Sequence, residues 1–183
     1  LAVVSAAAVA AAQTIKRNDN RGVDGLSFIS SEDHSRIGGG TNRILTLGAG
    51  GITKTGFGAV TIGSATAGDQ VAIALAADQA WTNDDDTTAL TILNGVSAST
   101  ATNRILTLSG TSTAANTISG IIANNGAGAL SLVKSGTGTW TLTAANTYTG
   151  GTTIDAGGAL QLGDRAANNL VLAAGTTITN NGT

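Results

Sequence analysis

Two short motifs recur along this chain, and their repetition constrains the fold more than any other feature. The heptapeptide TNRILTL occupies residues 41–47 and recurs unchanged at residues 102–108, an offset of 102 − 41 = 61. The segment KTGFGAVTI, residues 54–62, matches KSGTGTWTL, residues 134–142, at an offset of 134 − 54 = 80. Internal repeats of this kind are typical of solenoids, in which each coil buries its apolar face only against the next coil. The sequence therefore predicts a stack of coils.

The spacing within the two copies gives a first estimate of the coil length. Asn42 and Lys54 are 54 − 42 = 12 residues apart, whereas Asn103 and Lys134 are 134 − 103 = 31 residues apart. The difference, 31 − 12 = 19, is close to the roughly 20 residues of the shortest solenoid repeats. We therefore expect one additional coil in the second copy and about three coils across the 61-residue offset.

Short segments of alternating apolar and hydroxyl residues predict the strands. One example is residues 105–108, ILTL, and such segments end at Gly, Asn or Asp, which favour turns. Only 3% of the residues are aromatic, and the hydrophobic 42% is rich in alanine, so a narrow core suits this chain. The 26 glycines and the absence of proline indicate many tight turns. We expect an all-β fold, a right-handed parallel β-helix (β-solenoid) with short Gly/Asn-rich turns.

The charge balance excludes several classes of partner. Charged residues make up 11% of the chain, well below the roughly 25% of ordinary soluble domains. The net charge of −2 gives no electrostatic basis for binding nucleic acid or an anionic membrane. Because the hydrophobic fraction is high and the net charge low, the composition also argues against disorder. Cysteine is absent, so the chain needs neither disulfides nor a reducing compartment.

The N-terminal residues differ in composition from the rest. Residues 1–12, LAVVSAAAVAAA, resemble the end of a signal peptide without its positive charge. This segment is too short to span a bilayer, and we expect no transmembrane segment elsewhere. We expect residues 1–22 to form an Ala-rich cap or inter-subunit segment, and residues 23–183 to form the solenoid.

Two roles of this N-terminal segment stay open, because the end of a solenoid exposes unpaired strand edges. The segment can cap its own chain, with a helix favoured by its alanines. It can instead pair with another copy, which would make a homo-oligomer or a head-to-tail filament. The residues expected to carry such self-association are Leu1, Val3, Val4 and Val9.

One acidic run is the candidate metal site. Asp84, Asp85 and Asp86 are consecutive, and neighbouring carboxylates can hold a hard cation such as Ca²⁺. Neither an EF-hand pattern nor a nonapeptide calcium repeat surrounds them. A solvated corner is therefore favoured, and the three aspartates stay weak metal candidates.

No motif of catalysis or cofactor binding stands out. Glu32, Asp33 and His34 are adjacent, but neighbours on an extended segment point to opposite faces, so a polar loop is favoured over a catalytic group. The glycine runs at residues 38–40 and 48–51 lack the Lys-Ser/Thr of a phosphate-binding loop. The few aromatic residues are scattered, which favours packing over sugar binding. We expect no catalytic residues, no cofactor and no enzymatic activity.

One segment resembles a known family. Residues 144–163, AANTYTGGTTIDAGGALQLG, closely resemble the autotransporter passenger-associated strand repeat, and the preceding KSGTGTWTL resembles the turn and strand that lead into it. Ala144 stands where the family usually has glycine, and one further glycine is present at residues 157–158. The resemblance implies a right-handed parallel β-helix on the outer surface of a Gram-negative bacterium. The repeat carries no catalytic residues of the family.

The sequence thus favours a structural extracellular protein, a β-helical stalk or a self-assembling fibre subunit. Two other classes stay open. A ligand-binding adhesin segment would recognise a cell-surface or glycan ligand. An extracellular carbohydrate-active enzyme would need clustered carboxylates, which a single glutamate and scattered aspartates do not favour.

Overall fold

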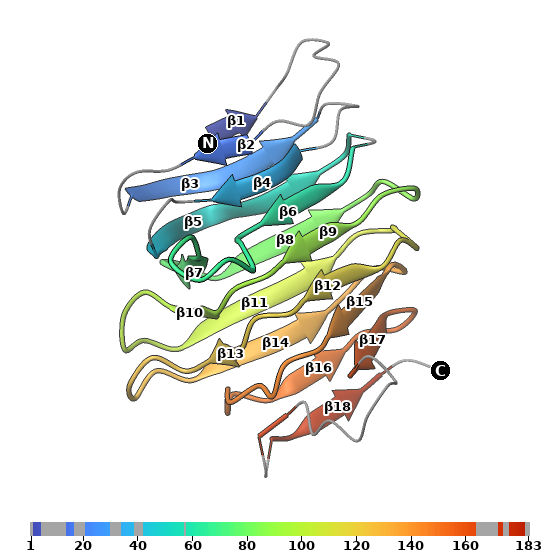
Figure 1. Ribbon diagram of the computed structural model, residues 1–183. Helices are drawn as coiled ribbons and strands as arrows, with labels where there is room; N and C mark the ends of the chain where they lie inside the picture. The colour runs from blue at the N-terminus through green and yellow to red at the C-terminus, as the bar shows by residue number, and fades with distance from the viewer. Residues whose placement is uncertain are drawn as a thin grey trace.

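The chain forms a parallel β-solenoid (Figure 1). The computed structural model describes residues 2–4, 14–16, 21–29, 34–38, 42–56, 58–163, 172–173 and 176–181. These residues contain 18 strands and no helix, and none of them belongs to a helix long and apolar enough to cross a membrane. The prediction of an all-β solenoid is confirmed.

The strands follow one another around the stack. They are β1 (Ala2–Val4), β2 (Thr14–Lys16), β3 (Arg21–Phe28), β4 (His34–Gly38), β5 (Arg43–Lys54), β6 (Val60–Ile62), β7 (Val71–Leu75), β8 (Gln79–Asn83), β9 (Leu90–Ile92), β10 (Val96–Ala98), β11 (Arg104–Ser109), β12 (Asn116–Ile118), β13 (Ile122–Ala123), β14 (Leu130–Lys134), β15 (Thr139–Leu142), β16 (Thr152–Ile154), β17 (Ala159–Leu162) and β18 (Ile178–Asn180).

Every pairing between these strands is parallel, and the strands lie on three faces. The first face holds β7, β10 and β13, and the second holds β8, β11, β14, β16 and β18. The long strand β5 joins the two, because its start pairs with β7 and its end with β8. The third face is the separate sheet β17-β15-β12-β9-β6-β4-β2.

The coil length varies along the stack. On the second face, one position per coil is occupied in register by Ile52, Trp81, Leu108, Lys134, Ile154 and Asn180. The longest of these coils has 81 − 52 = 29 residues and the shortest has 154 − 134 = 20. The short coil is the one whose sequence resembles the passenger repeat.

The predicted coil count between the TNRILTL copies is wrong. The first copy lies on the first face, where Arg43 pairs with Val71, and the second lies on the second face, where Arg104 pairs with Leu130. The 61-residue offset is therefore two coils and one face, not three coils. From Asn42 to Lys54 the chain covers the first and second faces of one coil, within β5. From Asn103 to Lys134 it covers the second, third and first faces and then the second face of the next coil. The second copy therefore contains two additional faces and not one additional coil.

The heptapeptide has the same exposure pattern in both places. Its two leucines are buried in each copy, and its isoleucine is exposed, 45% at Ile44 and 43% at Ile105. The motif thus encodes an extended strand with two inward leucines. It does not specify which face the strand occupies, so the distance between the two copies does not correspond to a whole number of coils.

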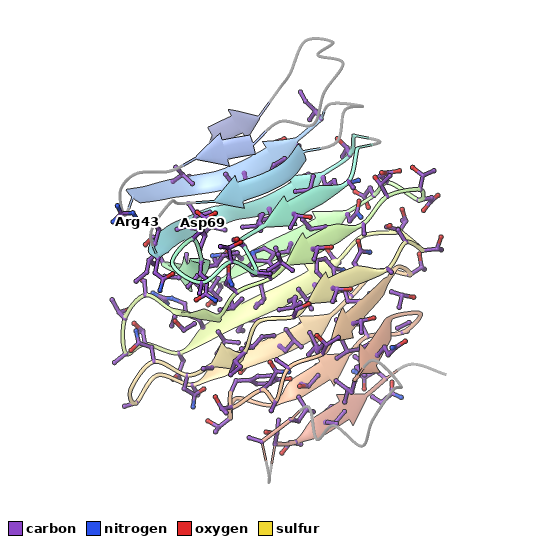
Figure 2. The ribbon with its side chains drawn as sticks, viewed as in Figure 1. Arg43 and Asp69 are labelled. Carbon is purple, nitrogen blue, oxygen red and sulfur yellow. The ribbon has the colours of Figure 1, made fainter. Side chains whose placement is uncertain are left out.

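Side chains line every described coil of the stack (Figure 2), and the buried apolar ones form one core cluster inside the three faces. Leu, Ile and Val from successive coils fill most of it, together with Trp81, Trp140 and Tyr148, all fully buried. Each indole N–H is satisfied, by Gln79 Oε1 at 2.9 Å and by the Ser109 carbonyl at 3.1 Å. The aromatic side chains that the structure describes, those of Phe28, Trp81, Trp140 and Tyr148, therefore pack inside the stack, as the sequence predicts.

The N-terminal segment continues the sheets. β1 pairs with β3 of the same chain, and β2 pairs with β4. The described part of residues 1–22 is thus extended rather than helical; Val3 and Val4 lie in β1, whereas Leu1 and Val9 lie outside the described residues. His34 is the first residue of β4. Its neighbours Glu32 and Asp33 lie outside the described residues, as does Phe57. The role of this segment in trans stays a prediction.

Candidate functional site

A buried ion pair lies at the corner where the second face turns toward the third. The Lys54 ammonium, with no exposed surface, donates to Asp85 Oδ2 at 2.6 Å, to Thr88 Oγ1 at 2.8 Å and to the Gly56 carbonyl at 2.9 Å. All three of its hydrogens therefore have acceptors. Asp85 is in the coil after Lys54, so the pair ties two coils together.

Asp85 is the acceptor at the centre of this network. Thr87 donates to its Oδ1 from the backbone N at 2.9 Å and from the hydroxyl at 2.7 Å, and the Thr88 hydroxyl donates to its Oδ2. Burial opposes the charge of the carboxylate, but the hydrogen bonds from Lys54, Thr88 and Thr87 outweigh burial and hold the pKa of Asp85 well below its usual range. Asp85 is thus a structural counter-ion.

The structure separates the three candidate metal ligands. Asp84 is exposed and accepts from the backbone N of Thr111 at 3.2 Å, Asp85 points inward to Lys54, and Asp86 is exposed. Within the described residues, no group of three metal-ligating side chains comes together. A solvated corner fits Asp84 and Asp86. No feature of the sequence signals that Asp85 faces a buried lysine 31 residues earlier.

Lys134 occupies the matching corner in the second copy of the K-x-G-x-G motif. Its ammonium donates to the Gly136 carbonyl at 2.8 Å, as Lys54 does to Gly56, and also to the Ser135 carbonyl. Lys134 is equally buried, but no carboxylate forms an ion pair with it within the described residues. Burial lowers the pKa of Lys134, and the nearby charge of Asp155 opposes this shift only in part.

Lys134→Met should therefore flatten the dependence of stability on pH. Because the pKa of Lys134 is lowered in the folded protein, the unfolded chain binds more protons between that lowered pKa and the ordinary value of 10.5. Stability then rises with pH through this window. Chemical denaturation between about pH 7 and 10 should show that the free energy of unfolding of the wild type increases relative to that of Lys134→Met as the pH increases. A constant difference between the two proteins across this range would contradict the assignment.

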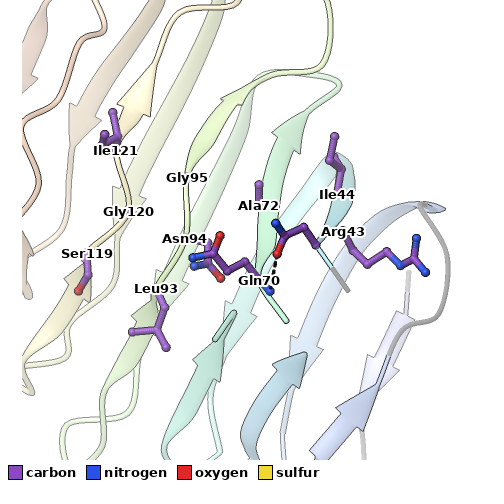
Figure 3. Close-up of a pocket in the computed structure, with 11 residues that line it drawn as sticks. Arg43, Ile44, Gln70, Ala72, Leu93, Asn94, Gly95, Ser119, Gly120 and Ile121 are labelled. Carbon is purple, nitrogen blue, oxygen red and sulfur yellow. Dashed lines mark hydrogen bonds between the residues drawn. The ribbon is translucent and has the colours of Figure 1, made fainter. Parts of the chain in front are cut away.

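A shallow groove of about 520 Å³ crosses the first face (Figure 3). Ile44 and Ile121 stand at its two ends, and the small residues Ala72 and Gly95 lie between them. In register these four residues occupy one outward position on β5, β7 and the two following coils. Large side chains at the ends and small ones between create the hollow.

Amide side chains line one side of this groove. Asn94 Oδ1 accepts from the backbone N of Ser64 at 2.9 Å and of Val71 at 3.0 Å, which fixes the loop before β7. Asn42 Oδ1 accepts from the backbone N of Gln70 at 3.3 Å. A second hollow of about 320 Å³ shares Ile44 and Ala72 and extends to Asn125. Among the described residues, Arg43 is the one charged residue that lines either hollow, so this face offers aliphatic contact and neutral hydrogen bonds.

The short coil is built around Tyr148. The Tyr148 ring is fully buried, and its hydroxyl is 2.6 Å from the hydroxyl of buried Thr152. The backbone N atoms of Thr147 and Tyr148 both donate to the Ile122 carbonyl, and Asn146 Oδ1 accepts from the backbone N of Ile122 at 2.8 Å. Among the described residues, this coil therefore has no strand between β15 and β16, and the segment that carries the buried Tyr148 ring bonds β13 of the preceding coil instead.

Residues 132–162 match the family model of the passenger-associated-transport-repeat. The match spans β14 to β17 and includes Lys134 and Tyr148. No curated protein sequence and no solved structure matches the chain significantly. This 31-residue match is consistent with an autotransporter passenger repeat, and it lies within the parallel solenoid.

Sequence reasoning located the asparagine-rich corners but missed the groove. Asn42, Asn94, Asn103, Asn116 and Asn146 each accept from a backbone N in a neighbouring coil. Each of these asparagines therefore links two neighbouring coils at a turn. The groove depends on which residues meet across coils of unequal length, and no motif in the sequence signals that.

Proposed function

We propose that this chain is part of an extracellular β-helix on the surface of a Gram-negative bacterium, where it acts as a structural stalk. The observation that carries the proposal is the unbroken parallel stack that contains the matched passenger repeat. Among the described residues, those that line the two hollows are mainly aliphatic side chains, glycines and neutral amide and hydroxyl side chains, together with Arg43.

The mechanical role follows from how adjacent coils are joined. Backbone hydrogen bonds run from coil to coil on all three faces, and corner asparagines and the Lys54–Asp85 pair add side-chain links. In such a stack each coil contacts only its neighbours. A force along the axis is therefore carried by the backbone hydrogen bonds between every pair of adjacent coils, and the stack resists extension without a wide core.

Antibody labelling of the source bacterium tests the location. An antibody raised against the purified chain should label intact cells, and brief protease treatment of intact cells should remove the signal. A cytoplasmic protein detected only after lysis serves as the control. Labelling that appears only in lysed cells would contradict the proposal.

A self-assembling fibre is the second form of this structural role. Negative-stain micrographs of the purified chain should show polymers whose length increases with protein concentration. Deleting residues 1–12, which contain Leu1, Val3, Val4 and Val9, should abolish them if that segment pairs in trans. Unchanged polymers in the deletion variant would rule that role out.

The groove favours one further candidate function, adhesion to a neutral glycan. Ala72→Trp fills the groove floor from an outward position on β7, and Ala80→Trp is the matched control from an exposed position on β8 outside both hollows. If the groove binds glycans, Ala72→Trp should weaken array binding at least about tenfold, which is about 1.4 kcal/mol, while Ala80→Trp should not. Equal binding by both variants would exclude the groove.

A further inference from the structure

We propose that Asn125 is a site of spontaneous deamidation that releases a link between two coils in the folded protein. Asn125 is followed by Gly126. This proposal is independent of the stalk function, because the chemistry needs only the folded chain and water.

The reaction is intramolecular. The backbone N of the following residue attacks the side-chain carboxamide carbon, a C–N bond forms, and ammonia leaves to give a five-membered imide. Water then opens the imide on either side, which yields aspartate or isoaspartate. Glycine as the following residue favours the attack because no Cβ hinders its N and its backbone is the most permissive. The carboxamide must also be free to turn toward that N.

The turn after β13 meets these requirements. Asn125 and Gly128 bond each other's backbones at 3.3 and 3.1 Å, so Gly126 and Ala127 form an exposed two-residue turn. Gly126 has a φ of +57°, and a Cβ there would meet only the Ala101 methyl at 3.5 Å. The Asn125 side chain lines the open second hollow, so water reaches it.

Within the part of the chain that the structure describes, one hydrogen bond restrains the Asn125 carboxamide. Its Nδ2 donates to the Ala98 carbonyl, in the preceding coil, at 2.8 Å. Asn94, which is also followed by glycine, is held much more firmly. Its Oδ1 accepts from the backbone N of Ser64 and of Val71, and its Nδ2 donates to the Ser64 carbonyl at 3.0 Å. Of the three Asn-Gly pairs in the sequence, those at residues 94–95 and 125–126 thus have the same reactive groups but different freedom of movement.

Deamidation of Asn125 would change a coil contact. The product loses the donor to the Ala98 carbonyl and places a carboxylate oxygen beside that acceptor. Two acceptors without a shared hydrogen repel each other. The contact between the coils that contain β10 and β13 would therefore weaken slowly as the protein ages.

The test compares the two sites in the same molecule. The purified full chain is incubated at mildly alkaline pH, and peptide mapping by mass spectrometry follows deamidation at Asn125 and Asn94. We expect the folded protein to deamidate at least about tenfold faster at Asn125. In concentrated urea the two rates should become similar, because both residues precede glycine. A folded-state ratio below about three would overturn the proposal.

Two variants separate the chemistry from general loosening of the fold. Gly126→Ala should slow deamidation at position 125 several-fold and leave Asn94 unchanged; an unchanged rate at position 125 would contradict attack by the backbone N of residue 126. Asn125→Asp, which imitates the product, should melt at a lower temperature than wild type and than Asn125→Ala. If the melting temperature of Asn125→Asp equals or exceeds that of Asn125→Ala, the proposed release of the coil contact is wrong.

Discussion

Lys54→Met is expected to lower the free energy of unfolding by about 3–5 kcal/mol, because it leaves the Asp85 carboxylate buried without its counter-ion. Both side chains of this pair are completely buried, and Asp85 Oδ2 lies 2.6 Å from the ammonium. Methionine keeps most of the volume of lysine, so the loss reports charge rather than packing. Urea denaturation at neutral pH measures the change.

Two companion variants control this result. Lys134→Met makes the same substitution at the matching corner, where no ion pair is present among the described residues, and should be neutral or stabilising. The double variant Lys54→Met with Asp85→Leu should recover most of the loss, because well-packed apolar pairs often replace buried ion pairs without cost. A loss below about 1 kcal/mol in Lys54→Met, the range of an exposed salt bridge, would contradict the assignment.

Tyr148→Ala is expected to destabilise the protein by about 3–5 kcal/mol, the range of large aromatic truncations in cores. The ring fills the interior of the shortest coil, and its removal also leaves the buried Thr152 hydroxyl without its partner. Tyr148→Phe keeps the ring and should cost only about 1–2 kcal/mol. Equal losses in the two variants would show that the hydroxyl pair, not the ring, sustains the short coil.

The contacts of the short coil explain several residues of the matched repeat. Asn146 bonds the backbone of the previous coil, the Tyr148 ring is buried in the core, and Thr152 bonds the tyrosine hydroxyl. Gly150 approaches the Leu130 carbonyl so closely that a Cβ would lie 2.5 Å from its oxygen. The segment therefore encodes a coil of 20 residues instead of 26 or more in the two coils before it.

The fold was predictable from the sequence because its signals are local. Alternating residues such as Leu106 and Leu108 mark the strands, and the Asn- and Gly-rich turns mark the corners. The face that each strand occupies was not predictable, since TNRILTL forms equally good strands on two faces. Only the register across coils decides that assignment.

The candidate site was less predictable for the same reason. Lys54 and Asp85 meet across one coil, and the aspartate looked like one of three equivalent surface carboxylates. The groove arises where Ala72 and Gly95 fall between Ile44 and Ile121. Both features need the register, which coils of unequal length conceal. The repeated Lys-x-Gly-x-Gly within apolar surroundings was the one available sign of a buried lysine.

Disulfide trapping on the third face tests the stacked coils most directly, because the chain has no cysteine of its own. Thr91, Thr117 and Thr141 pair in register on β9, β12 and β15. Neighbouring strands are about 4.8 Å apart, within the range of Cα separations that a disulfide tolerates. Thr91→Cys with Thr117→Cys should therefore form an intramolecular disulfide in the folded protein. Thr91→Cys with Thr141→Cys, two coils apart at about 9.6 Å, should not. A disulfide in the second pair but not in the first would contradict the solenoid.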